Sequence, residues 1–300
     1  MIYPASLKKG DKIAILSPAS HIKHEYVDAA CRVISEWGYE PVVSEHCKGQ
    51  FGTYSGTIEE RLADLKAALA DASVRAILCS RGGYGVVHLM EYLTAEDFNR
   101  DPKWIIGFSD ISVMHAAMVS AGVVSLHAPM TKQFHDFGAD NECVRLIHDV
   151  ITGTMPTYTE MPHKYNRNGE VSGQLVGGNL AVLCGLIGSR LDILKGDKIL
   201  FIEDVGEAVY SIERMLYNLR LDGTLANIRG LIVGQFTEYK NPDGNGESME
   251  DMIHRMVEPY GFPVAFGFPF GHVDRNLPMI EGANVKLSVT DGGTTLQFCK

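Results

Sequence analysis

Short apolar runs alternate with helical segments through the first half of the chain, and this alternation constrains the fold most strongly. Apolar runs at residues 12–16, 74–79 and 104–106 are each followed by a segment in which apolar side chains recur every three or four positions. Strands that alternate with helices pair in parallel, because a parallel pair needs a crossover connection between its strands. We therefore predict an α/β domain with a parallel sheet in residues 1–150.

The pattern changes after this domain. Thr, Pro, Asn, Gly and His dominate residues 151–170, where little periodicity remains, so we predict a linker there. Residues 171–300 form the second predicted domain. It contains expected strands at residues 199–202, 230–236, 285–289 and 295–298, and a polar insertion at 241–248.

The chain carries a net charge of −10, from 27 Lys and Arg against 37 Asp and Glu. This balance disfavours a nucleic acid or an anionic membrane surface as the partner and favours a small substrate.

No apolar run approaches the roughly 18 residues that cross a bilayer. Residues 1–11 lack the pattern of a secretory signal, so we expect a cytoplasmic protein.

The six cysteines are scattered and form no Cys-x-x-Cys pair, which disfavours both a disulfide framework and a zinc cluster. His-Glu-x-x-His and related ligand spacings are also absent from the sequence. We therefore expect no catalytic metal and no cofactor.

Polar residues follow four of the predicted strands. Ser17, the segment 81–85, the segment 107–110 and His127 each come directly after an apolar run. Ligands of an open parallel sheet gather beyond the carboxyl ends of its strands. We therefore expect these four loops to line one rim of the first domain.

The segment Gly107-Phe108-Ser109-Asp110 lies between a predicted strand and a predicted helix. A nucleophile elbow places an exposed hydroxyl at such a point, where the free N–H groups and dipole of the helix stabilise an oxyanion. The local pattern by itself favours helix capping by Ser109, Asp110 or Ser112, since the second glycine of the hydrolase elbow is missing.

The segment Arg81-Gly82-Gly83-Tyr84-Gly85 also connects a strand to a helix. Its glycines allow the backbone to approach a ligand closely and to supply a second oxyanion donor. The alternatives are a phosphate cradle, which the absence of Gly-Lys-Ser/Thr and Gly-x-Gly-x-x-Gly disfavours, and a tight turn with a structural arginine.

A nucleophilic serine needs a base and a group that orients the base. His272 lies in a loop fixed by glycine and proline after an apolar strand, and His127 at a strand end is the other candidate base. His115 falls inside a predicted helix and is interpreted as a packed or exposed helix residue. Glu203 directly ends a strand, although Glu203 and Asp204 can also serve as a helix cap.

Six segments together resemble the LD-carboxypeptidase family of serine peptidases, in the same order and over nearly the whole chain. They are Ser17-Pro18-Ala19-Ser20, Arg81-Gly82-Gly83-Tyr84-Gly85, Gly107-Phe108-Ser109-Asp110, Gly177-Gly178-Asn179, residues 201–207 and Gly271-His272. The resemblance implies an N-terminal α/β domain of flavodoxin or glutamine-amidotransferase type and a smaller, β-rich C-terminal domain. It also implies a site between the two domains and a homodimer.

Carried over residue by residue, the resemblance makes Ser109 the nucleophile, His272 the general base and Glu203 the residue that orients it. The backbone N–H groups of Asp110, Gly82 and Gly83 are implied to form the oxyanion hole. Arg81 suits the capture of a terminal carboxylate, because a guanidinium binds a carboxylate bidentately. The matching segments also give Ser17 and Asn179 as expected substrate contacts.

The reaction implied is hydrolysis of the amide bond between an L-centre and a C-terminal D-amino acid. In peptidoglycan recycling this means release of D-alanine from the muropeptide tetrapeptide, where the L-centre belongs to meso-diaminopimelate. The alternative within the family is a microcin C immunity peptidase, and the Val205-Gly206-Glu207 continuation resembles the carboxypeptidase branch. Outside the family, an α/β-hydrolase-like esterase and a non-catalytic ligand-binding protein are the competing hypotheses.

Overall fold

The computed structural model describes residues 1–241 and 246–300. Residues 242–245, inside the polar insertion expected at 241–248, lie outside the described residues. In the part of the chain that is described, no helix has the length and apolar character needed to cross a membrane.

The described chain divides into two compact units, each with its own sheet. The first unit comprises Met1–Met155 and Asp274–Gly282, and the second comprises Pro156–Val273 and Ala283–Lys300. The chain therefore passes from one unit to the other three times. Each unit is described below by itself.

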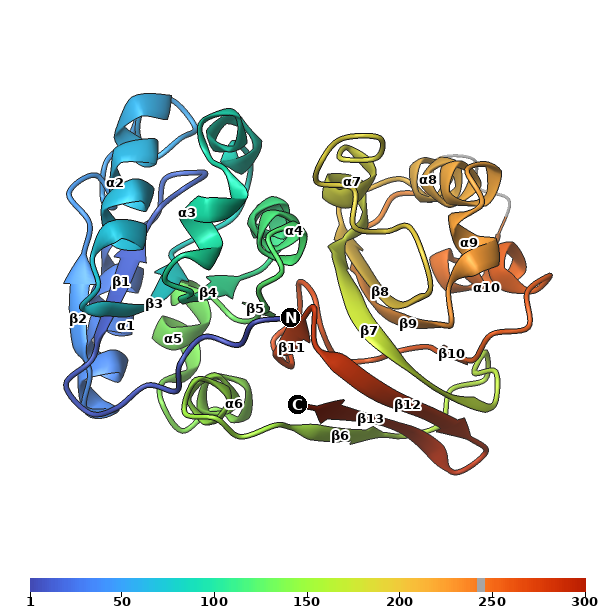
Figure 1. Cartoon of the computed structure of the whole chain (residues 1–300). Helices are drawn as coiled ribbons and strands as arrows, with labels where there is room; N and C mark the ends of the chain where they lie inside the picture. The colour runs from blue at the N-terminus through green and yellow to red at the C-terminus, as the bar shows by residue number, and fades with distance from the viewer. Residues whose placement is uncertain (242–245) are drawn as a thin grey trace. The chain divides into compact units, whose positions relative to one another are not determined.

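The sheet of the first unit has six strands in the order β11-β5-β4-β3-β1-β2. The pairs from β5 to β2 are parallel, and β11 is antiparallel to β5. This arrangement confirms the predicted parallel α/β domain (Figure 1). The strands are β1 (Lys12–Leu16), β2 (Glu40–Val43), β3 (Val74–Cys79), β4 (Trp104–Gly107), β5 (Ser125–His127) and β11 (Met279–Glu281).

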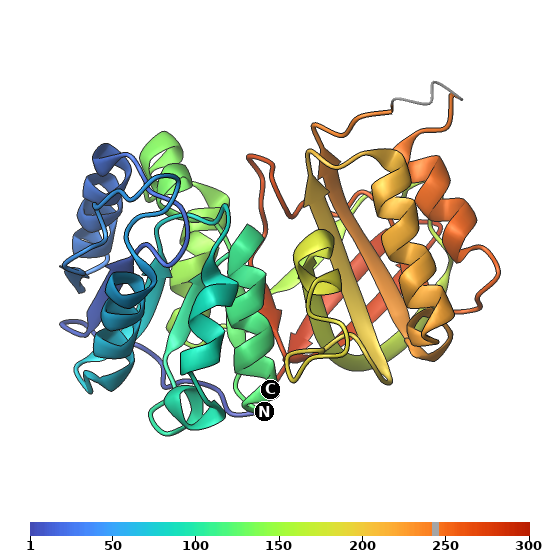
Figure 2. The same cartoon turned by 90° about the horizontal axis from the view of Figure 1, so that it is seen from above.

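Helices lie on both faces of this sheet, with α1 and α5 on one face and α2, α3 and α4 on the other (Figure 2). Strands buried on both faces are continuously apolar, which explains runs such as that of β1. The helices are α1 (His24–Glu36), α2 (Ile58–Ala70), α3 (Ala95–Asn99), α4 (Ser112–Ser120), α5 (Thr131–Phe137) and α6 (Glu142–Ile151), with short 3₁₀ helices η1 (Val86–Tyr92) and η2 (Ser109–Ile111).

The segment Asp274–Gly282 returns to the first unit from within the second half of the sequence. Its strand β11 pairs with β5, and Arg275 forms a 3.0 Å ion pair with Glu142 of α6. The predicted second domain, residues 171–300, includes this segment, so its boundary differs from that of the second unit. A three-residue strand is too short to show periodicity, so the sequence pattern contained no sign of this return.

The second unit has a seven-stranded mixed sheet in the order β10-β9-β8-β7-β12-β13-β6. The long strand β7 joins its two halves, since residues 169–174 pair antiparallel with β12 and residues 174–179 pair parallel with β8. The strands are β6 (Thr157–Glu160), β7 (Gly169–Asn179), β8 (Lys198–Val205), β9 (Gly230–Thr237), β10 (Val264–Ala265), β12 (Asn284–Thr290) and β13 (Gly293–Cys299).

Strand β6 lies within residues 151–170, the segment expected to be a linker. It pairs with β13 at the edge of the sheet, and Tyr158 is its buried residue. An edge strand with a single buried apolar side chain gives almost no hydrophobic alternation, which is why the segment looked like a connection.

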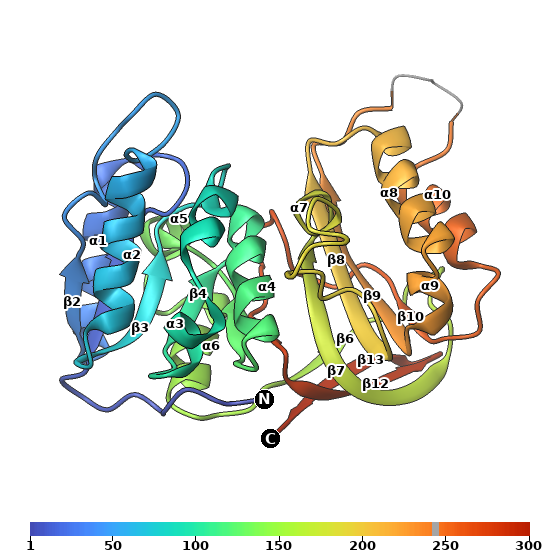
Figure 3. The same ribbon diagram turned by 45° about the horizontal axis from the view of Figure 1, so that its top comes forward.

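Helices α8 (Val209–Leu221), α9 (Thr224–Asn227) and α10 (Met249–Val257) lie along one side of the parallel strands, and α7 (Leu180–Cys184) follows β7 (Figure 3).

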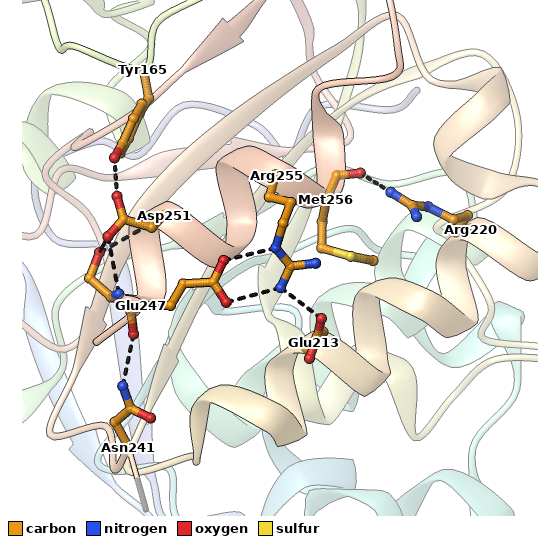
Figure 4. Close-up of polar contacts among 9 residues, drawn as sticks. Tyr165, Glu213, Arg220, Asn241, Glu247, Asp251, Arg255 and Met256 are labelled. Carbon is orange, nitrogen blue, oxygen red and sulfur yellow. Dashed lines mark hydrogen bonds and ion pairs between the residues drawn. The ribbon is translucent and has the colours of Figure 1, made fainter. Parts of the chain in front are cut away.

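Figure 4 shows how α8 and α10 are joined. Arg255 of α10 binds Glu213 of α8 and Glu247, each at 2.8 Å, and Arg220 donates to the Met256 carbonyl. Tyr165 contacts Asp251 in the first turn of α10. These polar contacts supplement the buried faces of the two helices.

The Gly177-Gly178 pair is explained by close packing within the second sheet. A β-carbon at Gly177 would overlap the carbonyl oxygen of Phe201 in β8, and Gly178 has a φ of +123°. Gly173, in the same strand, has room, because its β-carbon would lie 3.4 Å from Arg229 and 3.6 Å from Ile199.

We therefore predict that Gly177→Ala destabilises the second unit by about 3 kcal/mol, the upper range for an overpacked core. Gly173→Ala is the matched control and should change stability by less than about 1 kcal/mol. Urea unfolding followed by circular dichroism measures both. Equal stabilities of the two variants would contradict this account of the glycine pair.

Candidate active site

Ser109 lies in a strained turn between β4 and α4. Its φ is +66°, and Glu238 is the other non-glycine residue with positive φ in the part of the chain that is described. A non-glycine residue keeps such a conformation only where the surrounding structure enforces it. The N-cap positions of η2 and α4 are Phe108 and Ile111, and neither caps its helix through its side chain, whereas the carboxylate of Asp110 accepts from the N–H of Val86 at the start of η1.

The glycine turn at residues 82–83 packs directly on this serine. A β-carbon at Gly82 would lie 2.8 Å from Cβ and 2.9 Å from Oγ of Ser109, and 3.1 Å from the backbone nitrogen of Asp110. Gly83 has a φ of +106°, and its β-carbon would overlap the side chain of Ser20. Glycine is therefore required at both positions, and the structure brings Gly82, Ser109 and Asp110 together.

The carboxylate of Asp110 links the two loops. It is buried and accepts a hydrogen bond of 2.9 Å from the N–H of Val86, the first residue of η1. Burial raises the pKa of Asp110 above its usual range, and the hydrogen bond opposes that rise. The side chain thus fixes the loop, while its backbone N–H remains next to Ser109.

Arg61 of α2 is a residue whose importance sequence analysis missed. It is 2% exposed and donates to the carbonyls of Pro18, Gly85 and Gly56, at 2.7, 2.9 and 3.1 Å. Its guanidinium also lies over the ring of Tyr54. One buried side chain therefore ties together three loops at this end of the sheet.

The three expected substrate contacts differ in their surroundings. Arg81 is exposed, and its Nη1 donates to the carbonyl of His21 at 3.1 Å. Ser17 is buried, and its hydroxyl bonds the Cys47 carbonyl and the Ser80 hydroxyl. Asn179 is also buried, where it caps α7 by accepting from the N–H of Val182. The side chains of Ser17 and Asn179 thus serve internal contacts.

In the second unit, Glu203 and His272 form a hydrogen-bonded pair. Nδ1 of His272 lies 2.8 Å from Oε2 of Glu203, whose side chain is fully buried, while the imidazole is 22% exposed. A carboxylate only accepts hydrogen bonds, so Nδ1 carries the proton and Nε2 of the neutral ring is the basic nitrogen. This is the geometry of a general base held by an acid.

The loop before His272 is fixed by close packing. A β-carbon at Gly271 would lie 2.8 Å from Oε2 of Glu203, and its φ is +110°, so only glycine fits there. Phe268 and Phe270 hydrogen-bond the backbone of β9, through Val233 and Gln235 at 3.1 Å each. The imidazole therefore follows a segment held by close packing and by hydrogen bonds to β9.

Two opposing effects act on the imidazole. Burial disfavours the charged ring, but the hydrogen bond and negative charge of Glu203 outweigh burial and raise the pKa of His272 above its usual value. Burial, reinforced by the charge of Glu203, raises the pKa of Asp204 to about 6. Asp204 accepts from the N–H of Ala181 at 2.8 Å, so the helix-capping alternative holds for Asp204 and not for Glu203.

His127, the other candidate base, is fully buried in β5, where it pairs with Gly107 of β4 and Met279 of β11. Over residues 1–241 and 246–300, no three His, Cys, Asp or Glu side chains converge in a way that would hold a metal ion. The described geometry therefore provides an acid–base pair in one unit and a strained serine turn in the other.

Known proteins resemble this chain over nearly its whole length. The family model described as the LD-carboxypeptidase N-terminal domain matches residues 13–128, and the C-terminal domain model matches residues 172–287. The chain is 31% identical to a putative carboxypeptidase of Synechocystis, over 98% of this chain and 96% of that protein. It is 30% identical to a probable murein peptide carboxypeptidase of Bacillus subtilis, over 96% and 92%.

Among solved structures, the chain resembles a muramoyltetrapeptide carboxypeptidase from Oxalobacter formigenes, with a TM-score of 0.89 and 27% identity over 96% of this chain and 99% of that one. It is also 25% identical to the microcin C7 self-immunity protein MccF of Escherichia coli, over 95% of this chain and 92% of that protein. The domain models and the full-length carboxypeptidase relatives together place the chain in the LD-carboxypeptidase family.

Proposed function

We propose that this chain is a serine LD-carboxypeptidase that releases the terminal D-alanine of muropeptide tetrapeptides during peptidoglycan recycling. The observation that carries the proposal is the 2.8 Å hydrogen bond between His272 and Glu203, which leaves Nε2 as a base. The strained turn of Ser109 against Gly82 supports it from the other unit. The named murein peptide carboxypeptidase relatives support the substrate class.

In the proposed mechanism, Ser109 Oγ attacks the carbonyl carbon of the amide between the L-centre of meso-diaminopimelate and D-alanine. His272 Nε2 takes the hydroxyl proton and returns it to the departing amine of D-alanine. Water then hydrolyses the acyl-enzyme, with His272 again acting as the base. Glu203 holds the imidazole in the required tautomer throughout.

The backbone N–H groups of Asp110, Gly82 and Gly83 are the proposed oxyanion donors, since that turn packs on the serine. The nucleophile belongs to the proposed domain 1–150 and the acid–base pair to the domain 171–300, so turnover requires both. A homodimer and a cytoplasmic location, which the family resemblance implies, belong to the same proposal.

A microcin C immunity-type activity is the second candidate, and the sequence similarity to MccF favours it. The two functions differ in the group beyond the scissile bond, which is D-alanine in one and a nucleotide in the other. Parallel assays with the tetrapeptide and with aspartyl sulfamoyl adenosine distinguish them. Faster cleavage of the nucleotide compound would reverse the assignment of substrate.

Ser109→Ala is expected to lower kcat for the tetrapeptide L-Ala-D-Glu-meso-diaminopimelate-D-Ala by roughly 10³-fold or more, because the covalent step is lost. Enzymatic detection of free D-alanine measures the rate. Ser120→Ala, at the exposed end of α4, is the control and should retain the wild-type rate. A Ser109→Ala chain with near-normal turnover would remove the serine from its proposed role.

The pH dependence of kcat/KM tests the acid–base pair. The base must be neutral, so the rate rises with pH through the pKa of His272, which lies above its usual value. Glu203→Gln keeps a hydrogen-bond acceptor but removes the negative charge, so the pH at which kcat/KM reaches half its maximum should move to lower pH. The maximum value of kcat/KM at high pH should fall about 10²-fold or more. Glu170→Gln, on the exposed surface of β7, should change neither quantity. An unshifted midpoint in Glu203→Gln would contradict the pairing.

Arg81 is the proposed anchor for the terminal carboxylate. We expect Arg81→Ala to raise KM about 10- to 100-fold, since a charge-assisted hydrogen bond is lost, with a smaller effect on kcat. The C-terminally amidated tetrapeptide provides the matched test. The wild-type chain should bind the amidated tetrapeptide more weakly than the tetrapeptide with a free C-terminal carboxylate. Arg81→Ala should bind the two peptides equally. Additive effects of the two changes would show that the arginine and the carboxylate do not interact.

A further inference from the structure

The carbonyl of Gly107, two residues before Ser109, is held by two donors. The N–H of Ala128, just after β5, donates to it at 3.0 Å, and Nε2 of His115 in α4 lies 2.8 Å from it. The end of β4 is thus tied both to its neighbouring strand and to the helix that follows the serine turn.

The hydrogen bonds of His115 fix its tautomer. A carbonyl oxygen only accepts, so Nε2 carries the proton and Nδ1 accepts from the hydroxyl of Ser125 at 2.9 Å. The ring is fully buried in the first unit, and burial lowers the pKa of His115 to about 4. The imidazole is therefore neutral at physiological pH and has one donor and one acceptor, each with a partner.

Both ends of the serine turn are consequently anchored. On the upstream side, a β-carbon at Gly107 would lie 3.0 Å from Ile111 and 3.2 Å from Cys79, so the strand end packs closely against both residues. On the downstream side, Asp110 is bound to the N–H of Val86. Backbone strain at the residue between these anchors persists only while both hold.

We propose that His115 is a positioning residue for Ser109, acting through the Gly107 carbonyl. The inference rests on the proposed role of Ser109 as nucleophile. The sequence pattern indicates only that His115 is a packed or exposed residue of a helix. Release of the carbonyl would let the end of β4 shift and the Ser109 backbone relax, which would move Oγ away from its line of attack.

Two amide substitutions separate this role from simple packing. The amide of His115→Gln reaches the place of Nε2 and can still donate to Gly107, whereas the shorter amide of His115→Asn reaches the place of Nδ1 near Ser125. We expect His115→Asn to lower kcat for the tetrapeptide about 10²-fold with little change in KM, as a displacement of about 1 Å would. His115→Gln should recover most of that loss.

The rate at which a fluorophosphonate labels Ser109 provides a second readout, which should fall in His115→Asn in parallel with kcat. Ile34→Ala, in the core of α1, serves as a control of comparable thermal destabilisation that should retain kcat. If His115→Asn does not fold, His115→Phe removes both hydrogen bonds while keeping a ring in the same space, and the same loss of kcat is expected.

Equal kcat in wild type and His115→Asn, or equal losses in the Asn and Gln variants, would overturn the positioning role. These outcomes are distinguishable from failure of the proposed function, because they are interpreted beside Ser109→Ala. A Ser109→Ala chain that still turns over refutes the nucleophile itself. An inactive Ser109→Ala chain with unaffected His115 variants refutes only the inference about His115.

Discussion

The burial of a carboxylate at the end of β8 is the constraint on which the second unit depends. Glu203 is fully buried, and its Oε2 accepts from His272. An unpaired buried charge costs several kcal/mol, so the fold has to bring a donor to this point. Gly271 is required because any side chain there would collide with Glu203, and the loop reaches its position through its hydrogen bonds to β9.

The first unit meets a different requirement, the maintenance of an unfavourable backbone conformation at Ser109. The glycine turn packs on the serine from one side, Asp110 binds the start of η1, and His115 holds the end of β4. Arg61 ties the loops around them through carbonyl groups. Buried polar groups with satisfied hydrogen bonds provide this rigidity, because they specify one arrangement where apolar contacts would tolerate several.

The proposed chemistry divides between the units in a way that suits each fold. The parallel sheet ends in loops and a helix N-terminus, which suit a nucleophile and an oxyanion. The mixed sheet offers a strand end and a rigid return loop, which suit an acid–base pair. The net charge of −10 is a property of the whole chain and does not give the local charge of either region. Arg81, in a loop, and Arg61, in α2, belong to the first unit, and the carboxylates of Glu203 and Asp204 belong to the second.

Apolar periodicity and glycine positions are local signals, and they were enough to predict the parallel α/β domain, the position of Ser109 after a strand and the glycine-containing loop of His272. The family resemblance already assigned Glu203 to orient His272. The tertiary structure was needed to show that Asp204 caps α7, that Ser17 and Asn179 serve internal contacts, and that Arg61 and His115 are buried. It also decided the return of Asp274–Gly282 to the first sheet. A polar side chain acquires its role from partners distant in sequence, and no local pattern records which partners those are.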